Sequence, residues 1–147
     1  MLLYHGSKTK IESIEKRQAR AKLGVDVPED ELQNAIYFTP SRETAIAMAS
    51  RPEGLTKIND NEIWFENPEK FNPDLDIYIY TIDSDKIDSS FLKQCEDENQ
   101  FVYLGDNLMP ENTEKLKAIE VAKYFKLLNW KSKEESKVEL GTYFKMK

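Results

Sequence analysis

The sequence has little of several residue types that mark specialised classes of protein. Its single cysteine, Cys95, cannot form an internal disulfide, and its single histidine, His5, with no cysteine pair gives no zinc-binding pattern. Five glycines and six prolines exclude a collagen-like chain, and no apolar run approaches the roughly 20 residues of a membrane-spanning helix. We therefore expect no disulfide framework, no metal site and no membrane span.

The excess of acidic residues argues against one class of partner. The chain has 27 Asp and Glu against 21 Lys and Arg, a formal net charge of -6, whereas sequence-independent binding of nucleic acid needs many cations to neutralise phosphates. The basic stretch at residues 16–22 is by default a solvated helix face. Its functional alternative is a phosphate or acidic-partner contact from Arg17 or Arg20. No secretory leader pattern is present near the N-terminus, so we expect a cytoplasmic location.

Length and composition indicate one domain over residues 1–147, with 39% apolar and 33% charged residues. Strands are predicted at residues 2–4, 35–38, 63–65, 77–82, 101–104 and 119–128, the last as one strand or a strand pair, whereas residues 138–146 are a final edge strand or a frayed tail. The alternation of residues 77–82 predicts that this strand has one buried face. Helices are predicted at residues 11–23 and 41–50, helical turns at 90–94 and 111–116, and a loop at 25–33 whose functional alternative is a lid. Strands spread along the chain without a βαβ rhythm indicate an α+β fold with mostly antiparallel pairing.

Two strand ends carry the residues that indicate a site. The apolar run of residues 2–4 is expected to end in a turn at His5-Gly6-Ser7, where glycine permits a close approach. The β-prone run of residues 35–38 contains Tyr37 and precedes a Thr-Pro pair, in which threonine can cap a helix and proline suits its first turn. Taken singly, the histidine reads as a turn or core residue and the tyrosine as a buried aromatic.

Together the two segments resemble the nicotinamide pocket of ADP-ribosyltransferases of the diphtheria-toxin and poly(ADP-ribose) polymerase type, which includes small bacterial and phage mono-ADP-ribosyltransferases. In that family a His-Gly-Ser/Thr strand end faces a Tyr-Phe strand end. The resemblance implies a split, mostly antiparallel β-sheet and NAD as the substrate. It also implies that His5 bonds the adenosine-side ribose, that the Gly6 backbone, in one segment with Ser7, bonds the carboxamide, and that Tyr37 stacks on nicotinamide across the same cleft.

The third element of that family differs in this sequence. Such enzymes commonly carry a glutamate just before a late strand, where it binds the nicotinamide ribose and stabilises the developing positive charge. The matching position here is Gln100, whose amide supplies a dipole in place of a charge. Glu98 is the alternative carboxylate, and Gln100 also reads as an ordinary polar residue beside a strand. The resemblance further implies a carboxamide contact from Ser41 or Thr44.

These residues leave three functions open. The first is an NAD-dependent mono-ADP-ribosyltransferase that releases nicotinamide and modifies an unknown acceptor, which is a protein, a nucleic-acid base or a small molecule. The second is a module of the same fold that binds NAD or ADP-ribose without catalysis, which the missing carboxylate favours. The third is a small interaction protein without a nucleotide. RNA 2′-phosphotransferase chemistry is disfavoured, because it needs several basic residues in its pocket and the chain has one histidine and few arginines.

Overall fold

The computed structural model describes residues 1–15, 17–18, 34–95 and 99–129. Its strands and its α-helix run in the order β1 (Leu2–Ser7), β2 (Arg17–Gln18), β3 (Asn34–Phe38), α1 (Arg42–Ser50), β4 (Thr56–Asn59), β5 (Glu62–Phe65), β6 (Asp76–Asp83), β7 (Leu92–Gln94), β8 (Phe101–Tyr103), β9 (Asn112–Lys117) and β10 (Lys126–Asn129). The 3₁₀ helices between them are η2 (Pro68–Lys70), η3 (Ser84–Lys86), η4 (Ser89–Phe91) and η5 (Ala118–Lys123). The described part of the chain is therefore α+β, as predicted.

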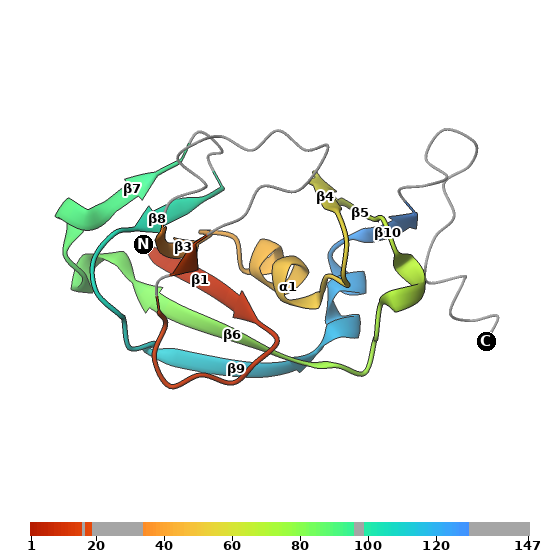
Figure 1. Cartoon of the computed structure of the whole chain (residues 1–147), viewed down its shortest axis with the longest axis horizontal. Helices are drawn as coiled ribbons and strands as arrows, with labels where there is room; N and C mark the ends of the chain where they lie inside the picture. Colours follow the sequence, from red (N-terminus) through yellow and green to blue (C-terminus); the bar gives the residue numbers. More distant parts are fainter. Residues whose placement is uncertain (16, 19–33, 96–98, 130–147) are drawn as a thin grey trace.

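Three small sheets lie around α1 (Figure 1). Their strand orders are β1-β6-β9, β2-β3-β8-β7 and β10-β5-β4. All pairings between the described strands are antiparallel except that of β10 with β5, which is parallel. The predicted, mostly antiparallel pairing is thus confirmed. α1 packs against β1 and β6 and also contacts η5, so it connects the first sheet with the segment that leads into β10.

Side chains that alternate along β6 enter two different cores. Ile77 and Ile79 lie in the core beneath α1, whereas Tyr80 and Ile82 pack with Leu3 in a second core. Each of these five side chains is at most 2% exposed. The alternation in the sequence predicts a strand with one buried face, and this prediction is wrong, because apolar residues cover both faces of β6.

The helix α1 forms where the sequence predicts it, but its cap is a different residue from the expected threonine. Oγ of Ser41 accepts a hydrogen bond from the backbone N–H of Thr44 at 3.1 Å, which makes Ser41 the N-cap. Thr39 acts one step earlier, because its Oγ1 accepts the N–H of Ser41 at 3.1 Å. At the other end the N–H of Arg51 bonds to the carbonyl of Ala47 at 3.2 Å, and a proline follows.

Glycine at position 6 is required by the close crossing of α1 over β1. A Cβ atom built on Gly6 would lie 2.2 Å from the carbonyl oxygen of Ala45 and 3.0 Å from Cβ of Ala49. Backbone atoms of a helix cannot move away by rotating a side chain, so any larger residue must displace α1. The small residues Ala45 and Ala49 on the helix and Gly6 on the strand together allow this contact.

A bidentate ion pair joins α1 to β9. Nε and Nη2 of Arg42 donate to the two carboxylate oxygens of Glu114 at 2.9 and 2.7 Å, and Nη1 donates to the hydroxyl of Tyr124 at 3.4 Å. Both charged side chains are about one-third exposed. The hydrogen bonds from Arg42, opposed by partial burial, lower the pKa of the Glu114 carboxyl group, and the same bonds raise the pKa of Arg42.

Replacing this carboxylate should make stability depend less on pH. Glu114→Gln is expected to lower the free energy of unfolding by about 1 kcal/mol at pH 7. Because the folded-state pKa of Glu114 lies below its unfolded value, the contribution is full above the unfolded pKa of about 4.3 and is lost as the pH falls through the folded value. Urea denaturation at pH 7 and at pH 3 checks this. Glu111→Gln, which breaks the more exposed pair with Lys86, is the control and should cost less.

Several predicted elements are wrong. His5-Gly6-Ser7 continues β1 and forms no turn there. The helix predicted at residues 11–23 is absent from the described part of that range, where Ile14 bridges Leu108 and β2 pairs with β3. The helical turn predicted at residues 111–116 is strand β9, because pairing with β6 outweighs the helix propensity of its Glu, Lys and Leu residues.

Other predictions are confirmed in part or are not described. Residues 90–94 divide between η4 and β7, and residues 119–128 between η5 and β10. The sequence did not predict β4, whose four residues are mostly polar. The loop predicted at residues 25–33 and the strand predicted at residues 138–146 lie outside the described residues. None of the helices in the described residues has the length and apolar character needed to cross a bilayer.

Candidate functional site

β1 and β3 meet at one backbone pair and then separate into different sheets. The N–H of Tyr4 donates to the carbonyl of Thr39 at 2.8 Å, and the N–H of Thr39 donates to the carbonyl of Tyr4 at 3.0 Å. In the described residues this bridge is the one backbone pairing between the two strands. The continuing antiparallel register would make Gly6 and Tyr37 the next hydrogen-bonded pair.

A side-chain hydrogen bond from His5 replaces the backbone hydrogen bond that would come next in a continuous sheet. Nδ1 of His5 lies 2.9 Å from the carbonyl oxygen of Tyr37, which is the oxygen that the N–H of Gly6 would reach in a continuous sheet. A carbonyl oxygen can only accept, so Nδ1 carries the proton. In the neutral ring Nε2 is therefore an acceptor. The imidazole thus holds the two strand ends together through a side chain while their backbones diverge.

The backbone of Gly6 consequently faces the gap between the strands. Residues two apart on a strand direct their N–H and C=O groups to the same edge, so Gly6 faces β3, as Tyr4 does, and not β6. The structure gives Gly6 no backbone bond to β3. The N–H and C=O groups of Gly6 lie side by side at this unpaired strand edge. They can therefore bind a group that offers one acceptor and one donor, such as a primary carboxamide.

The imidazole of His5 lies in an aromatic environment. Its ring centroid is 6.0 Å from that of Phe38, in an edge-to-face arrangement, and 6.4 Å from that of Tyr80. Tyr80 is the register partner of His5 on β6, and Phe38 is the neighbour of Tyr37 on β3. These contacts and the bond from Nδ1 fix the ring orientation.

The side chain of Tyr37 leaves β3 on the opposite face from that of Phe38. It packs against Ala35 and Val102, whereas Phe38 contacts His5. The expectation that the His5 and Tyr37 side chains face each other across one cleft is therefore wrong, because consecutive residues of a strand alternate between faces. Since paired Tyr4 and Thr39 share a face, Tyr37 shares the side of Gly6.

Gln100 lies close to Tyr37 by register. It directly precedes β8 and is half-buried, and its carbonyl accepts the N–H of Cys95 at 2.8 Å. Val102 is the register partner of Tyr37, and alternation places Gln100 on the same face as Val102. Diagonal neighbours of this kind are about 7–8 Å apart between Cα atoms, within reach of long side chains. The alternative carboxylate, Glu98, lies outside the described residues.

The other predicted contact residues have structural partners or cannot be placed. Oγ of Ser7 accepts the N–H of Thr9 at 3.1 Å, and the hydroxyl of Ser41 caps α1 and donates to Glu43 at 3.3 Å. Thr44 contributes its backbone N–H to that cap. The backbone of Arg17 pairs with Ala35 in β2, and Arg20 lies outside the described residues.

Tyr80 is a residue of the site that the sequence did not single out. Its side chain is fully buried, and burial raises the pKa of its hydroxyl although a backbone bond opposes the shift. That hydroxyl accepts the N–H of Ile11 at 2.7 Å and donates to the carbonyl of Thr9 at 3.2 Å. It therefore fixes the segment that follows β1. The alternation of residues 77–82 indicated a buried position, but not what a buried hydroxyl would bind.

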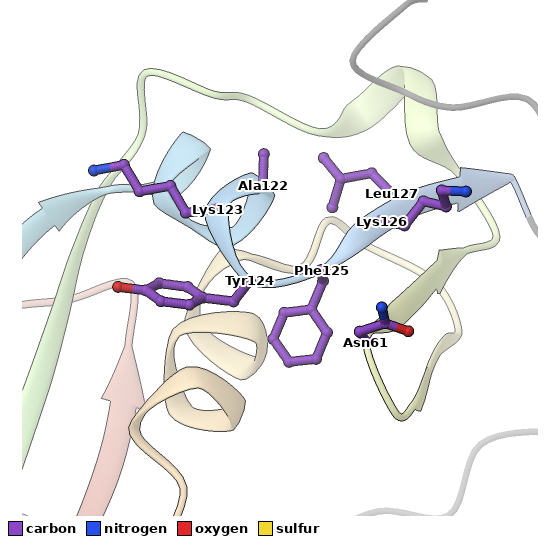
Figure 2. A pocket seen from close by; sticks show the side chains of 7 residues that line it. All are labelled: Asn61, Ala122, Lys123, Tyr124, Phe125, Lys126 and Leu127. Carbon is purple, nitrogen blue, oxygen red and sulfur yellow. The ribbon is translucent and has the colours of Figure 1, made fainter.

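A hollow away from β1 and β3 lies beside η5 and β10. This open depression of about 340 Å³ is flanked by lysines, and Figure 2 shows the seven residues that line it: Asn61, Ala122, Lys123, Tyr124, Phe125, Lys126 and Leu127. None of the site residues predicted from the sequence lines this hollow. Nor do the described residues bring three or more His, Cys, Asp or Glu side chains together as metal ligands.

Comparison with known proteins gives no functional information, so a functional assignment depends on the residues at the gap between β1 and β3. No family model, curated protein or solved structure matches this chain.

Proposed function

We propose that the chain is an NAD-dependent mono-ADP-ribosyltransferase whose nicotinamide site lies between the ends of β1 and β3. The observation that carries the proposal is that Nδ1 of His5 bonds to the carbonyl of Tyr37, so that the backbone of Gly6 faces an open edge. The resemblance of both segments to the ADP-ribosyltransferase family supports it, as does the α+β architecture in which these strands belong to different sheets.

The carboxamide of nicotinamide is the complement of that open edge. Its NH₂ group would donate to the carbonyl of Gly6, and its oxygen would accept the N–H of the same residue. The continuing register places Tyr37 opposite Gly6 and on the same side, so its ring would stack on the pyridine ring. Stacking on an aromatic side chain and a bidentate amide contact together would distinguish nicotinamide from other planar rings.

The reaction breaks the bond between the nicotinamide nitrogen and C1′ of the ribose. The bond electrons leave with nicotinamide, which becomes neutral, and C1′ develops positive charge before the acceptor attacks it and loses a proton. Nε2 of His5 is an acceptor in the neutral ring and would accept a hydrogen bond from a ribose hydroxyl. Gln100, on the face of Tyr37, would bond the ribose near C1′. The acceptor is a protein side chain, a nucleic-acid base or a small molecule.

A second candidate is a module that binds NAD or ADP-ribose without catalysis. The observation in its favour is that Gln100 supplies an amide where a transferase of this type needs a carboxylate. A neutral dipole stabilises an oxocarbenium ion less than a fixed charge does. Binding of NAD without release of nicotinamide would identify this function.

Loss of the Tyr37 ring should weaken binding of nicotinamide and NAD together. We expect Tyr37→Ala to reduce both affinities by about 1–3 kcal/mol, the cost of removing one aromatic stack. Titration calorimetry of each ligand with the full chain measures this. Tyr37→Phe retains the ring and is the matched control, so it should bind both ligands as the wild type does. Equal affinity in wild type and Tyr37→Ala would reject the stacking assignment, and no binding to wild type would favour the interaction protein.

A further inference from the structure

Two cations meet at the C-terminal end of α1, just beyond the candidate nicotinamide site. Nζ of Lys8 donates to the carbonyl oxygen of Ala49 at 2.6 Å, in the last turn of the helix. Arg51, the residue directly after α1, is half-buried at the same helix end. Lys8 follows Gly6 by two residues, which is about 7 Å along an extended strand.

Neither of these cations is neutralised by a carboxylate of the described residues. The other ion pairs of this part of the chain involve Met1, Arg42 and the lysines at positions 70, 86, 115, 117 and 123. Glu53 lies two residues after Arg51 in sequence, but it accepts Nζ of Lys70 at 3.3 Å.

The two charges carry an electrostatic cost. Lys8 as a whole is exposed, but partial desolvation of its ammonium group and, to a smaller extent, the positive charge of Arg51 lower its pKa to about 8. Burial alone lowers the pKa of Arg51. The hydroxyl of Ser50, which lies between Ala49 and Arg51 in sequence and is 2% exposed, also lacks a hydrogen-bond partner in the described structure. An anion bound here would relieve this repulsion.

We propose that Lys8 and Arg51 form a binding site for a phosphate group. The guanidinium fork of Arg51 suits two oxygens of one phosphate, and Lys8 supplies a point charge beside it. The ligand class is a dinucleotide with a pyrophosphate group. Its carboxamide-bearing ring would lie at Gly6 and its pyrophosphate at the end of α1. The identity of this nucleotide rests on the proposed function, whereas the anion site itself does not.

Stabilisation of the helix end explains the position of Lys8 but not that of Arg51. A lysine that bonds a C-terminal carbonyl favours a helix through its dipole and needs no ligand. Arg51 makes no such side-chain bond among the described residues, and its position next to Lys8 raises the cost of both charges. A phosphate accounts for both residues together.

The test is titration calorimetry with inorganic pyrophosphate at constant ionic strength, using the full-length chain. We expect Lys8→Gln and Arg51→Gln each to weaken pyrophosphate binding about 10-fold or more, because each removes a charged hydrogen-bond donor. Lys10→Gln removes the same charge from the same segment and is the matched control, so its affinity should equal that of the wild type. Lys8 is exposed, so Lys8→Gln removes no core contact and loses only the bond to the carbonyl of Ala49, and the test does not depend on the folding of Arg51→Gln.

Nicotinamide, titrated separately, distinguishes this inference from the proposed function. If nicotinamide binds wild type, Lys8→Gln and Arg51→Gln equally while pyrophosphate affinity falls in both variants, the inference is supported. If pyrophosphate fails to bind, or binds all four proteins equally, the phosphate site is rejected whatever nicotinamide does. If the wild type binds pyrophosphate through Lys8 and Arg51 but binds neither nicotinamide nor NAD, the phosphate site is supported and the transferase assignment fails.

Discussion

Gly6→Ala is expected to lower the free energy of unfolding by about 3 kcal/mol, at the upper end of the range for overpacking a close-packed contact. The added methyl group would meet the carbonyl oxygen of Ala45 at 2.2 Å, so α1 must move away from β1. Denaturation by urea, followed by circular dichroism, measures the change. Ser7→Ala is the control, because it lies one residue further along β1 and loses only the half-buried hydroxyl that accepts the N–H of Thr9.

The same substitution should abolish nicotinamide binding even where the variant remains folded. A displaced α1 would shift the backbone of Gly6, and with it the donor and acceptor that face the gap. We therefore expect no measurable nicotinamide affinity for Gly6→Ala under conditions in which circular dichroism shows it folded. Wild-type stability in Gly6→Ala would contradict the close crossing of α1 over β1, and a wild-type affinity would remove Gly6 from the site.

The local pattern of the sequence was sufficient to place the elements that frame the site. The β-prone residues before Thr39-Pro40 predict β3, and the Thr-Pro pair predicts the start of α1, although its cap is Ser41. The alternation of residues 77–82 predicts β6. For these elements short-range propensity and tertiary structure agree. The strand predicted at residues 2–4 was also identified, but it continues through Ser7 and does not turn at His5.

Other features depend on contacts between distant segments, which a single sequence does not show. The segment Asn112–Lys117 has helix-forming residues and becomes β9 only because β6 lies beside it. The hydrogen bond between Nδ1 of His5 and the carbonyl of Tyr37 forms only because β1 and β3 separate at this point. The same separation determines that Tyr37 lies on the face of Gly6 and not on that of His5, so no residue pattern could have shown it.

The departure of this chain from the family that it resembles provides a test of catalysis. Gln100→Glu should place a carboxylate near the ribose carbon that becomes positive, where a fixed charge stabilises the transition state more than a dipole does. We expect the rate of nicotinamide release from NAD to rise about 10-fold. Partial burial would raise the pKa of the new carboxyl group, so the increase should be largest above neutral pH, where that group is ionised. Chromatographic measurement of nicotinamide between pH 6 and pH 9 checks this.

Glu98 provides the contrasting assignment for the carboxylate. If Glu98 stabilises the transition state, Glu98→Gln should reduce nicotinamide release by about 10-fold or more, and Gln100→Glu should change it little. If Gln100 occupies the position beside the ribose, Glu98→Gln should be nearly silent, because stabilisation of the transition state then depends on residue 100. Gln94→Glu, which adds the same charge to the exposed side chain at the end of β7, controls for a general effect of net charge. Binding of NAD without nicotinamide release by wild type and both variants would favour the binding module, because neither carboxylate would then act on C1′.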